Sequence, residues 1–112
     1  MTIAAAITPT ITLTPAQSQE VCSILRKVLT SREAKQPLQA WVFGSRATGR
    51  ARPFSDLDLL ISQPPGLGWR EKADLADAFE ASNLPFRVDV VETSRLSHTM
   101  AARVMAERQV LI

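Results

Sequence analysis

The stretch from residue 44 to residue 61 joins two short apolar segments, and it limits the possible folds more than any other part of the chain. Residues 38–43 are apolar and end at a glycine, and residues 57–61 form a second apolar run, so both are predicted to be strands. Asp56 and Asp58 flank the first residue of the second strand. Because strand side chains alternate, both carboxylates are expected on one face, about 7 Å apart, with the apolar side chains opposite.

Predicted helices surround these two strands. Thr14, Pro15 and Gln17 form a helix-capping pattern, and the apolar spacing that follows predicts a helix over residues 15–33. A helix over 71–81, a strand over 86–91 and a last helix that begins at residue 94 or 97 come next. The final QVLI segment is expected to be a last core strand or a helix tail, with part of a partner interface as the alternative. This order predicts an α/β (α+β) domain with a small mixed sheet flanked by helices.

The composition fits one packed domain in a reducing compartment. The chain has 112 residues, of which 46% are hydrophobic, so we expect a domain over 15–112 preceded by an N-terminal arm over 1–14. Cys22 has no second cysteine to pair with, which favours a cytoplasmic protein. No apolar run approaches the roughly 20 residues that cross a bilayer. No membrane partner is therefore expected, and few aromatics and no dense basic patch argue against direct nucleic-acid binding.

Asp56 and Asp58 are candidate magnesium ligands. Two like charges on one face repel each other unless a cation lies between them, and Mg²⁺ prefers carboxylate oxygens. The alternative is a solvent-exposed pair at a strand end. Asp89 interrupts the apolar strand over 86–91 and would complete a three-carboxylate site if it faced the other two. Such a site suits two metal ions about 3.5–4 Å apart.

Gly44 and Ser45 directly follow the first strand and are candidate phosphate ligands. A glycine lets the backbone approach a phosphate closely, and N–H groups and a hydroxyl can hold its oxygens. Arg46, Arg50 and Arg52 lie in the same connection and could balance the phosphate charge. A plain turn with solvated arginines is the alternative.

These residues resemble the signature of the polymerase-beta-like nucleotidyltransferase superfamily: Gly-Ser, ten residues, Asp-x-Asp, and a later strand aspartate. The short chain resembles the minimal nucleotidyltransferases (MNT) of that superfamily. The resemblance implies that the Gly-Ser turn holds the triphosphate of ATP and that the three aspartates bind two Mg²⁺ ions. It departs at Thr48, where the family often has Arg. Either Arg50 or Arg52 is then expected to make the missing phosphate contact, or catalysis is weaker.

The resemblance also implies a reaction and a partner. A hydroxyl acceptor, deprotonated with the help of Asp89, would attack the α-phosphorus of ATP, and AMP would be transferred as pyrophosphate leaves. MNT proteins pair with helical HEPN-type or substrate-binding-like proteins in toxin–antitoxin systems. A HEPN-type toxin is therefore the expected acceptor and this chain its antitoxin, with the partner supplying the acceptor selectivity that so short a chain lacks. Two alternatives stay open: a non-catalytic antitoxin that acts by binding alone, and transfer to a small molecule.

Overall fold

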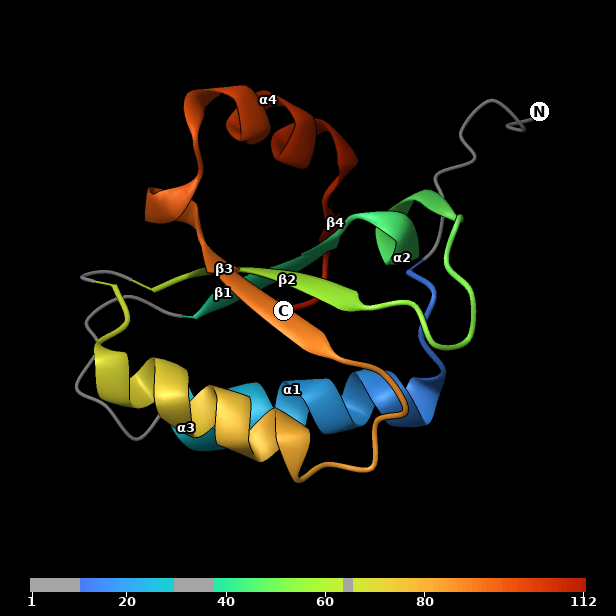
Figure 1. The fold of residues 1–112 in the computed structure, drawn as a ribbon, viewed down its shortest axis with the longest axis vertical. Coiled ribbons are helices and arrows are strands. Elements are labelled where there is room, and N and C mark those ends of the chain that lie inside the picture. Colours follow the sequence, from blue (N-terminus) through green and yellow to red (C-terminus); the bar gives the residue numbers. More distant parts are fainter. Residues whose placement is uncertain (1–10, 30–37, 64–65) are drawn as a thin grey trace.

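The computed structural model describes residues 11–29, 38–63 and 66–112, and a four-stranded mixed sheet forms its centre (Figure 1). The strands lie in the order β3-β2-β1-β4. β1 is antiparallel to both β2 and β4, whereas β2 and β3 are parallel. The strands are β1 (Gln39–Phe43), β2 (Leu57–Ser62), β3 (Val88–Glu92) and β4 (Gln109–Val110).

Helices cover both faces of this sheet, which confirms the fold class predicted from the sequence. The helices α1 (Pro15–Leu29) and α3 (Trp69–Glu80) lie against one face, and α4 (His98–Glu107) lies over the other (Figure 1). A short helix, α2 (Ser45–Thr48), follows β1, and a single 3₁₀ turn (Thr93–Arg95) follows β3. No helix among the described residues is long and apolar enough to cross a membrane.

The alternating side chains of β2 divide the core between the two faces. Leu57, Leu59 and Ile61 are buried in the larger cluster, which α1 and α3 complete, and Leu60 belongs to a smaller cluster with Phe43 and Val104 of α4. Because successive strand residues point to opposite faces, the residue between Leu57 and Leu59 faces α4 rather than the main core. That residue is Asp58, so the buried leucines fix the direction of a candidate site carboxylate.

Local signals placed several element ends correctly. The N–H of Thr14 donates to Gln17 Oε1 at 3.0 Å and the N–H of Gln17 donates to Thr14 Oγ1 at 3.1 Å, a reciprocal capping box before Pro15. The N–H of Met100 donates to Ser97 Oγ at 3.1 Å, so the last helix takes the later of the two predicted starts. The QVLI segment contributes β4. Residues 30–33 of the first predicted helix and residues 1–10 of the predicted arm lie outside the described residues.

Candidate functional site

The candidate carboxylates meet at one end of the strands, where β1 ends and β2 and β3 begin. Phe43 is the register partner of Asp58 across the β1–β2 pair, and Asp58 is the register partner of Asp89 across the β2–β3 pair. Residues opposite one another on neighbouring strands project from the same face of a sheet. Asp56 directly precedes β2 and is exposed. The fold therefore places three aspartates from two distant parts of the chain beside one another.

The three aspartates are close enough for their charges to interact. Burial raises the pKa of Asp58 above its usual value, and the negative charges of Asp89 and then Asp56 raise it further. A cation held between these groups would favour the ionised form of Asp58. An all-carboxylate donor set fits a hard ion such as Mg²⁺. Within residues 11–29, 38–63 and 66–112, no three His, Cys, Asp or Glu side chains are already arranged as a metal site.

Gly44 lies against Asp58 and cannot carry a side chain. Its φ of 74° is a backbone conformation that L-residues rarely adopt, and a Cβ placed on it would collide with Asp58 Oδ2 and lie 3.2 Å from Asp58 Cγ. Its carbonyl accepts bonds from the Ala47 and Thr48 N–H groups, at 3.0 and 3.2 Å. Thr48 Oγ1 adds a third bond to that carbonyl at 3.1 Å. The Gly44–Ser45 turn therefore opens α2 beside Asp58, and Thr48 stabilises it.

Arg46 has a structural position instead of the phosphate-binding one expected from the sequence. It is only 3% exposed, and its guanidinium lies 4.0 Å from the centre of the Phe86 ring. Nη1 donates to the Thr12 carbonyl at 2.7 Å, while Nε and Nη2 donate to the Ser55 carbonyl at 3.0 and 2.8 Å. Nη2 also approaches the carbonyl of Pro53 at 3.1 Å and the carbonyl of Arg52 at 3.4 Å. Because its donors are used in this way, Arg46 fixes the loop that precedes β2.

Arg50 and Arg52 lie in that same loop and remain candidates for the phosphate contact. Both are exposed, unlike Arg46. Arg50 Nε donates to Thr48 Oγ1 at 3.2 Å, which holds its side chain near the Gly44–Ser45 turn. The backbone N–H of Arg52 donates to Ser55 Oγ at 2.8 Å, so the loop itself is ordered while the Arg52 guanidinium faces solvent.

Helix α4 brings a further cation to the site, Arg103, which no sequence pattern indicated. A cavity of about 130 Å³ lies between the start of β2 and α4. Arg103 lines it together with Asp58, and Arg103 Nε forms an ion pair with Glu107 Oε1 at 3.2 Å. Residues 58 and 103 are far apart in sequence, and only the packing of α4 over this face of the sheet brings them together. The cavity is lined by Phe43, Gly44, Asp58, Met100, Arg103, Val104 and Glu107.

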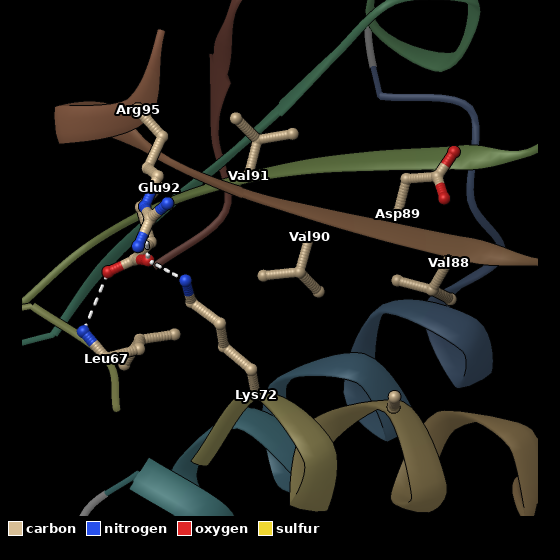
Figure 2. Close-up of a pocket in the computed structure, with 9 residues that line it drawn as sticks. Leu67, Lys72, Val88, Asp89, Val90, Val91, Glu92 and Arg95 are labelled. Atoms are coloured by element: carbon tan, nitrogen blue, oxygen red, sulfur yellow. Dashed lines mark hydrogen bonds and ion pairs between the residues drawn. The ribbon is translucent and has the colours of Figure 1, made fainter. Parts of the chain in front are cut away.

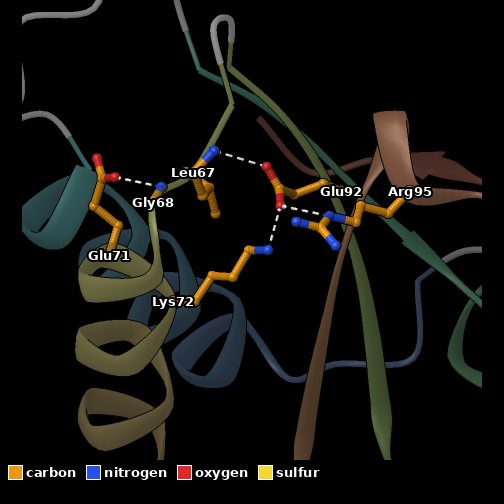
Figure 3. Close-up of polar contacts among 6 residues, drawn as sticks. All are labelled: Leu67, Gly68, Glu71, Lys72, Glu92 and Arg95. Atoms are coloured by element: carbon orange, nitrogen blue, oxygen red, sulfur yellow. Dashed lines mark hydrogen bonds and ion pairs between the residues drawn. The ribbon is translucent and has the colours of Figure 1, made fainter.

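A second polar cluster lies at the other end of β3 and anchors the crossover from β2 (Figure 3). Glu92 is 8% exposed; its Oε1 accepts from the Leu67 N–H at 2.7 Å, and its Oε2 lies 2.8 Å from Lys72 Nζ and 3.9 Å from Arg95 Nε. Burial alone would raise the pKa of Glu92, but the Leu67 N–H and the two cations outweigh it and lower that pKa. These groups satisfy one another, so this cluster stabilises the fold.

A groove runs from this cluster along β3 to Asp89, with a volume of about 300 Å³ (Figure 2). Leu67, Ala76, Val88 and Val90 give it an apolar floor. Figure 2 shows the side chains of Val88 and Val90 pointing toward α3, whereas that of Asp89 points to the opposite face. The Asp89 carboxylate therefore lies at the rim of this groove.

Comparisons with known proteins bear on the family and the fold. The family model described as "Polymerase beta, Nucleotidyltransferase" matches residues 25–112. The "Probable protein adenylyltransferase MntA" of Haemophilus influenzae (strain ATCC 51907 / DSM 11121 / KW20 / Rd) is 42% identical over 57 residues, which are 51% of this chain and 50% of that protein. The matched part thus spans half the length of this curated relative.

Solved structures share the fold. A structure assigned as a minimal nucleotidyltransferase is 33% identical with a TM-score of 0.61, over 84% of this chain and 88% of the other. A toxin–antitoxin complex with AMP-PNP contains a chain that is 22% identical with a TM-score of 0.67, over 85% and 72%. The complex of a tri-AMPylated Shewanella oneidensis HEPN toxin with an MNT antitoxin contains a chain that is 19% identical with a TM-score of 0.60, over 85% and 68%.

Proposed function

Because the chain belongs to the Polymerase beta, Nucleotidyltransferase family, we propose that it transfers AMP from ATP to a hydroxyl group of a partner protein and so acts as an antitoxin. One observation carries this proposal. Asp58 and Asp89 are register partners on neighbouring strands, with Asp56 beside them and the Gly44 turn in contact with Asp58. A glycine turn next to a carboxylate cluster can bind a metal-complexed triphosphate.

In this mechanism the chain mainly positions groups and neutralises charge. Asp56, Asp58 and Asp89 would hold two Mg²⁺ ions, which, when bound, neutralise the triphosphate and the leaving pyrophosphate. The Gly44–Ser45 turn would receive the phosphates, with Arg50 and Arg52 close to it.

Asp89 also has a role in proton transfer under this proposal. It is exposed and lies at the rim of the groove along β3, where it can accept the proton of the acceptor hydroxyl. The hydroxyl oxygen then attacks the α-phosphorus, the bond from that phosphorus to the bridging oxygen breaks, and pyrophosphate leaves with the electron pair.

The acceptor we propose is a HEPN-type toxin. The curated relative is named as a protein adenylyltransferase, and one structural neighbour is a complex of a tri-AMPylated HEPN toxin with an MNT antitoxin. Modification of a toxin side chain would neutralise it covalently. A binding-only antitoxin is the second candidate, and Thr48 favours it, because the family often has Arg at this position.

Transfer of label from ATP separates these candidates. The chain would be incubated with MgCl₂, a co-expressed HEPN-type partner, and ATP labelled on either the α- or the γ-phosphate. We expect the α-label alone to reach the partner, and Asp58→Asn or Asp89→Asn to abolish transfer. Asp74→Asn, which changes an exposed carboxylate on α3, is the matched control and should retain full activity.

The opposite result would be equally clear. If no label is incorporated and the Asp58→Asn variant neutralises the toxin as well as the unmodified chain, the binding-only function replaces the enzymatic one. Label found on a small molecule in place of the partner would indicate that the chain transfers AMP to a small molecule.

A further inference from the structure

Strand β3 is an edge of the sheet among the described residues, and its hydrogen-bonding direction can be worked out residue by residue. The N–H of Leu57 donates to the Arg87 carbonyl at 2.8 Å, and Leu57 is the register partner of Val88. In a parallel pair, such a residue bonds to the two neighbours of its register partner. Arg87 and Asp89 therefore direct their backbone groups toward β2.

The intervening residues direct their backbone groups to the free edge. The N–H and C=O of Val88 and Val90 point away from β2, because backbone groups alternate along a strand. No strand in the described residues pairs with that outer side. An edge of this kind is a template for another extended chain.

The position of Asp89 links this free edge to the chemistry. A peptide that pairs antiparallel with Val88 and Val90 places one residue directly opposite Asp89, in the closely spaced pair that lacks hydrogen bonds, with Cα atoms about 4.5 Å apart. Side chains of directly opposite residues lie on the same face. A hydroxyl-bearing side chain at that position is therefore presented to the Asp89 carboxylate.

The groove beside β3 determines which side chains fit on each side of the hydroxyl-bearing residue. In a paired strand, the residues on each side of the hydroxyl residue point to the face of Val88 and Val90, which is the apolar floor completed by Leu67 and Ala76. Apolar side chains would be buried there. At the far end, Glu92 is already paired with Lys72 and Arg95, and these residues close the groove (Figure 3).

We infer that the acceptor adds an extended apolar–hydroxyl–apolar segment to the free edge of β3 as an antiparallel strand, with its hydroxyl at Asp89. This inference rests on the proposed function for its chemistry, because it assigns to that reaction the shape and sequence pattern of the acceptor segment. It assigns the peptide docking surface to the backbone of Val88 and Val90.

The probe that tests binding is a synthetic peptide, Lys-Thr-Val-Tyr-Val-Thr-Lys with blocked ends, added to the ¹⁵N-labelled full chain without ATP. We expect the amide signals of Val88 and Val90 to shift and their hydrogen exchange to slow, while the inward amide of Asp89 changes little. N-methylation of both peptide valines removes the two donors that face β3 and should weaken binding about tenfold. N-methylation of the central tyrosine, whose amide faces away, is the matched control and should leave the affinity within about twofold.

A substitution in the chain tests the same surface on the folded partner. Val88→Pro removes one outward N–H at the first residue of β3, where proline is tolerated. We expect Val88→Pro to lower AMP transfer to the partner at least about fivefold with ATP binding unchanged, whereas the α3 control Asp74→Asn should retain transfer.

The results that overturn the inference differ from those that overturn the proposed function. Equal binding of all three peptides, or loss of binding only with the tyrosine N-methyl peptide, would exclude this antiparallel docking. Equal transfer by Val88→Pro and the Asp74→Asn control would exclude it for the partner. If even the unmodified chain transfers no AMP, the proposed function fails, and peptide binding measured without ATP still decides whether the edge is a docking surface.

Discussion

The carboxyl group of Asp58 occupies the space beside Gly44 where any other residue would carry its Cβ. Two constraints therefore act on one glycine: a positive φ of 74° and direct contact with a site carboxylate. The contact arises because β1 ends at the level where β2 begins, with Phe43 opposite Asp58. The phosphate-binding turn and the metal-binding strand of the proposed site are thus one packed unit.

Gly44→Ala is expected to disrupt this unit, and Gly49→Ala provides a matched control. Gly49 has a similar φ of 78°, but nothing lies within 4 Å of the Cβ it would gain. Gly49→Ala should cost about 1 kcal/mol from backbone strain alone. Gly44→Ala should cost about 1–3 kcal/mol more, because Asp58 or the turn must move, and should weaken ATP binding. Urea denaturation and ATP titration check both; equal effects of the two substitutions would contradict the contact with Asp58.

Asp58→Asn is expected to stabilise the metal-free protein at neutral pH. The folded-state pKa of Asp58 is raised, so its contribution to stability is fully present below the unfolded pKa and is lost as the pH rises through the folded pKa. At pH 7 the charged form is disfavoured in the folded state, and Asn removes that penalty. Melting temperatures in EDTA should be higher for the variant at pH 7, and this advantage should disappear below about pH 4.

Magnesium should reverse this order. Ligands that bind only the folded state raise its stability, so MgCl₂ with ATP should raise the melting temperature of the unmodified chain and leave that of Asp58→Asn nearly unchanged. A variant that is stabilised by MgCl₂ as strongly as the unmodified chain would exclude Asp58 as a ligand.

Glu92→Gln is expected to lose stability in the opposite pH range. The folded-state pKa of Glu92 is lowered, so its contribution is present above the unfolded pKa and is lost as the pH falls through the folded pKa. We expect a loss of about 1–3 kcal/mol at pH 7, which shrinks below about pH 4. Glu107→Gln removes a surface ion pair with Arg103 and should cost under about 1 kcal/mol. Urea titrations at pH 7 and pH 3.5 measure the free energy of unfolding of both variants. Equal losses of that free energy in the two variants would argue against Glu92 as an anchor.

Arg46→Lys is expected to act on stability, whereas substitutions at Arg50 and Arg52 should act on nucleotide binding. A lysine cannot reproduce the fork of bonds to the carbonyls of Thr12 and Ser55, so Arg46→Lys should cost about 2–4 kcal/mol. The double variant Arg50→Ala/Arg52→Ala should change stability by under about 1 kcal/mol and weaken ATP binding. Thermal melts and ATP titration distinguish them; an Arg46→Lys variant with unchanged melting and weaker ATP binding would restore the phosphate role for Arg46.

Much of the fold could be predicted because the signals are local. The capping box at Thr14, the Ser97 cap and the alternation of apolar residues in β2 involve neighbours in the chain. The direction of Asp58 follows from the burial of Leu57 and Leu59 on each side of it. Four-residue helix α2 escaped prediction because a glycine-serine turn carries too little periodicity to distinguish a turn from a short helix.

The roles of the arginines could not be read in this way, because a guanidinium takes its function from whatever groups surround it in space. Three arginines in one connection looked equivalent in sequence, yet Phe86 and the carbonyl of Thr12 surround only Arg46. Arg103 reaches the site only because α4 packs over the sheet. Lys72 and Glu92, twenty residues apart, pair because β3 runs parallel to β2 beside α3.

The sequence by itself determined where the three longer strands and the three longer helices lie, and which face of β2 is polar, because backbone geometry and burial repeat over a few residues. Only the tertiary structure decided that Asp89 stands beside Asp58, that Gly44 touches Asp58, and that no described strand pairs with the outer edge of β3. Strand order and register depend on how distant segments share one core, and that information is distributed over the whole chain.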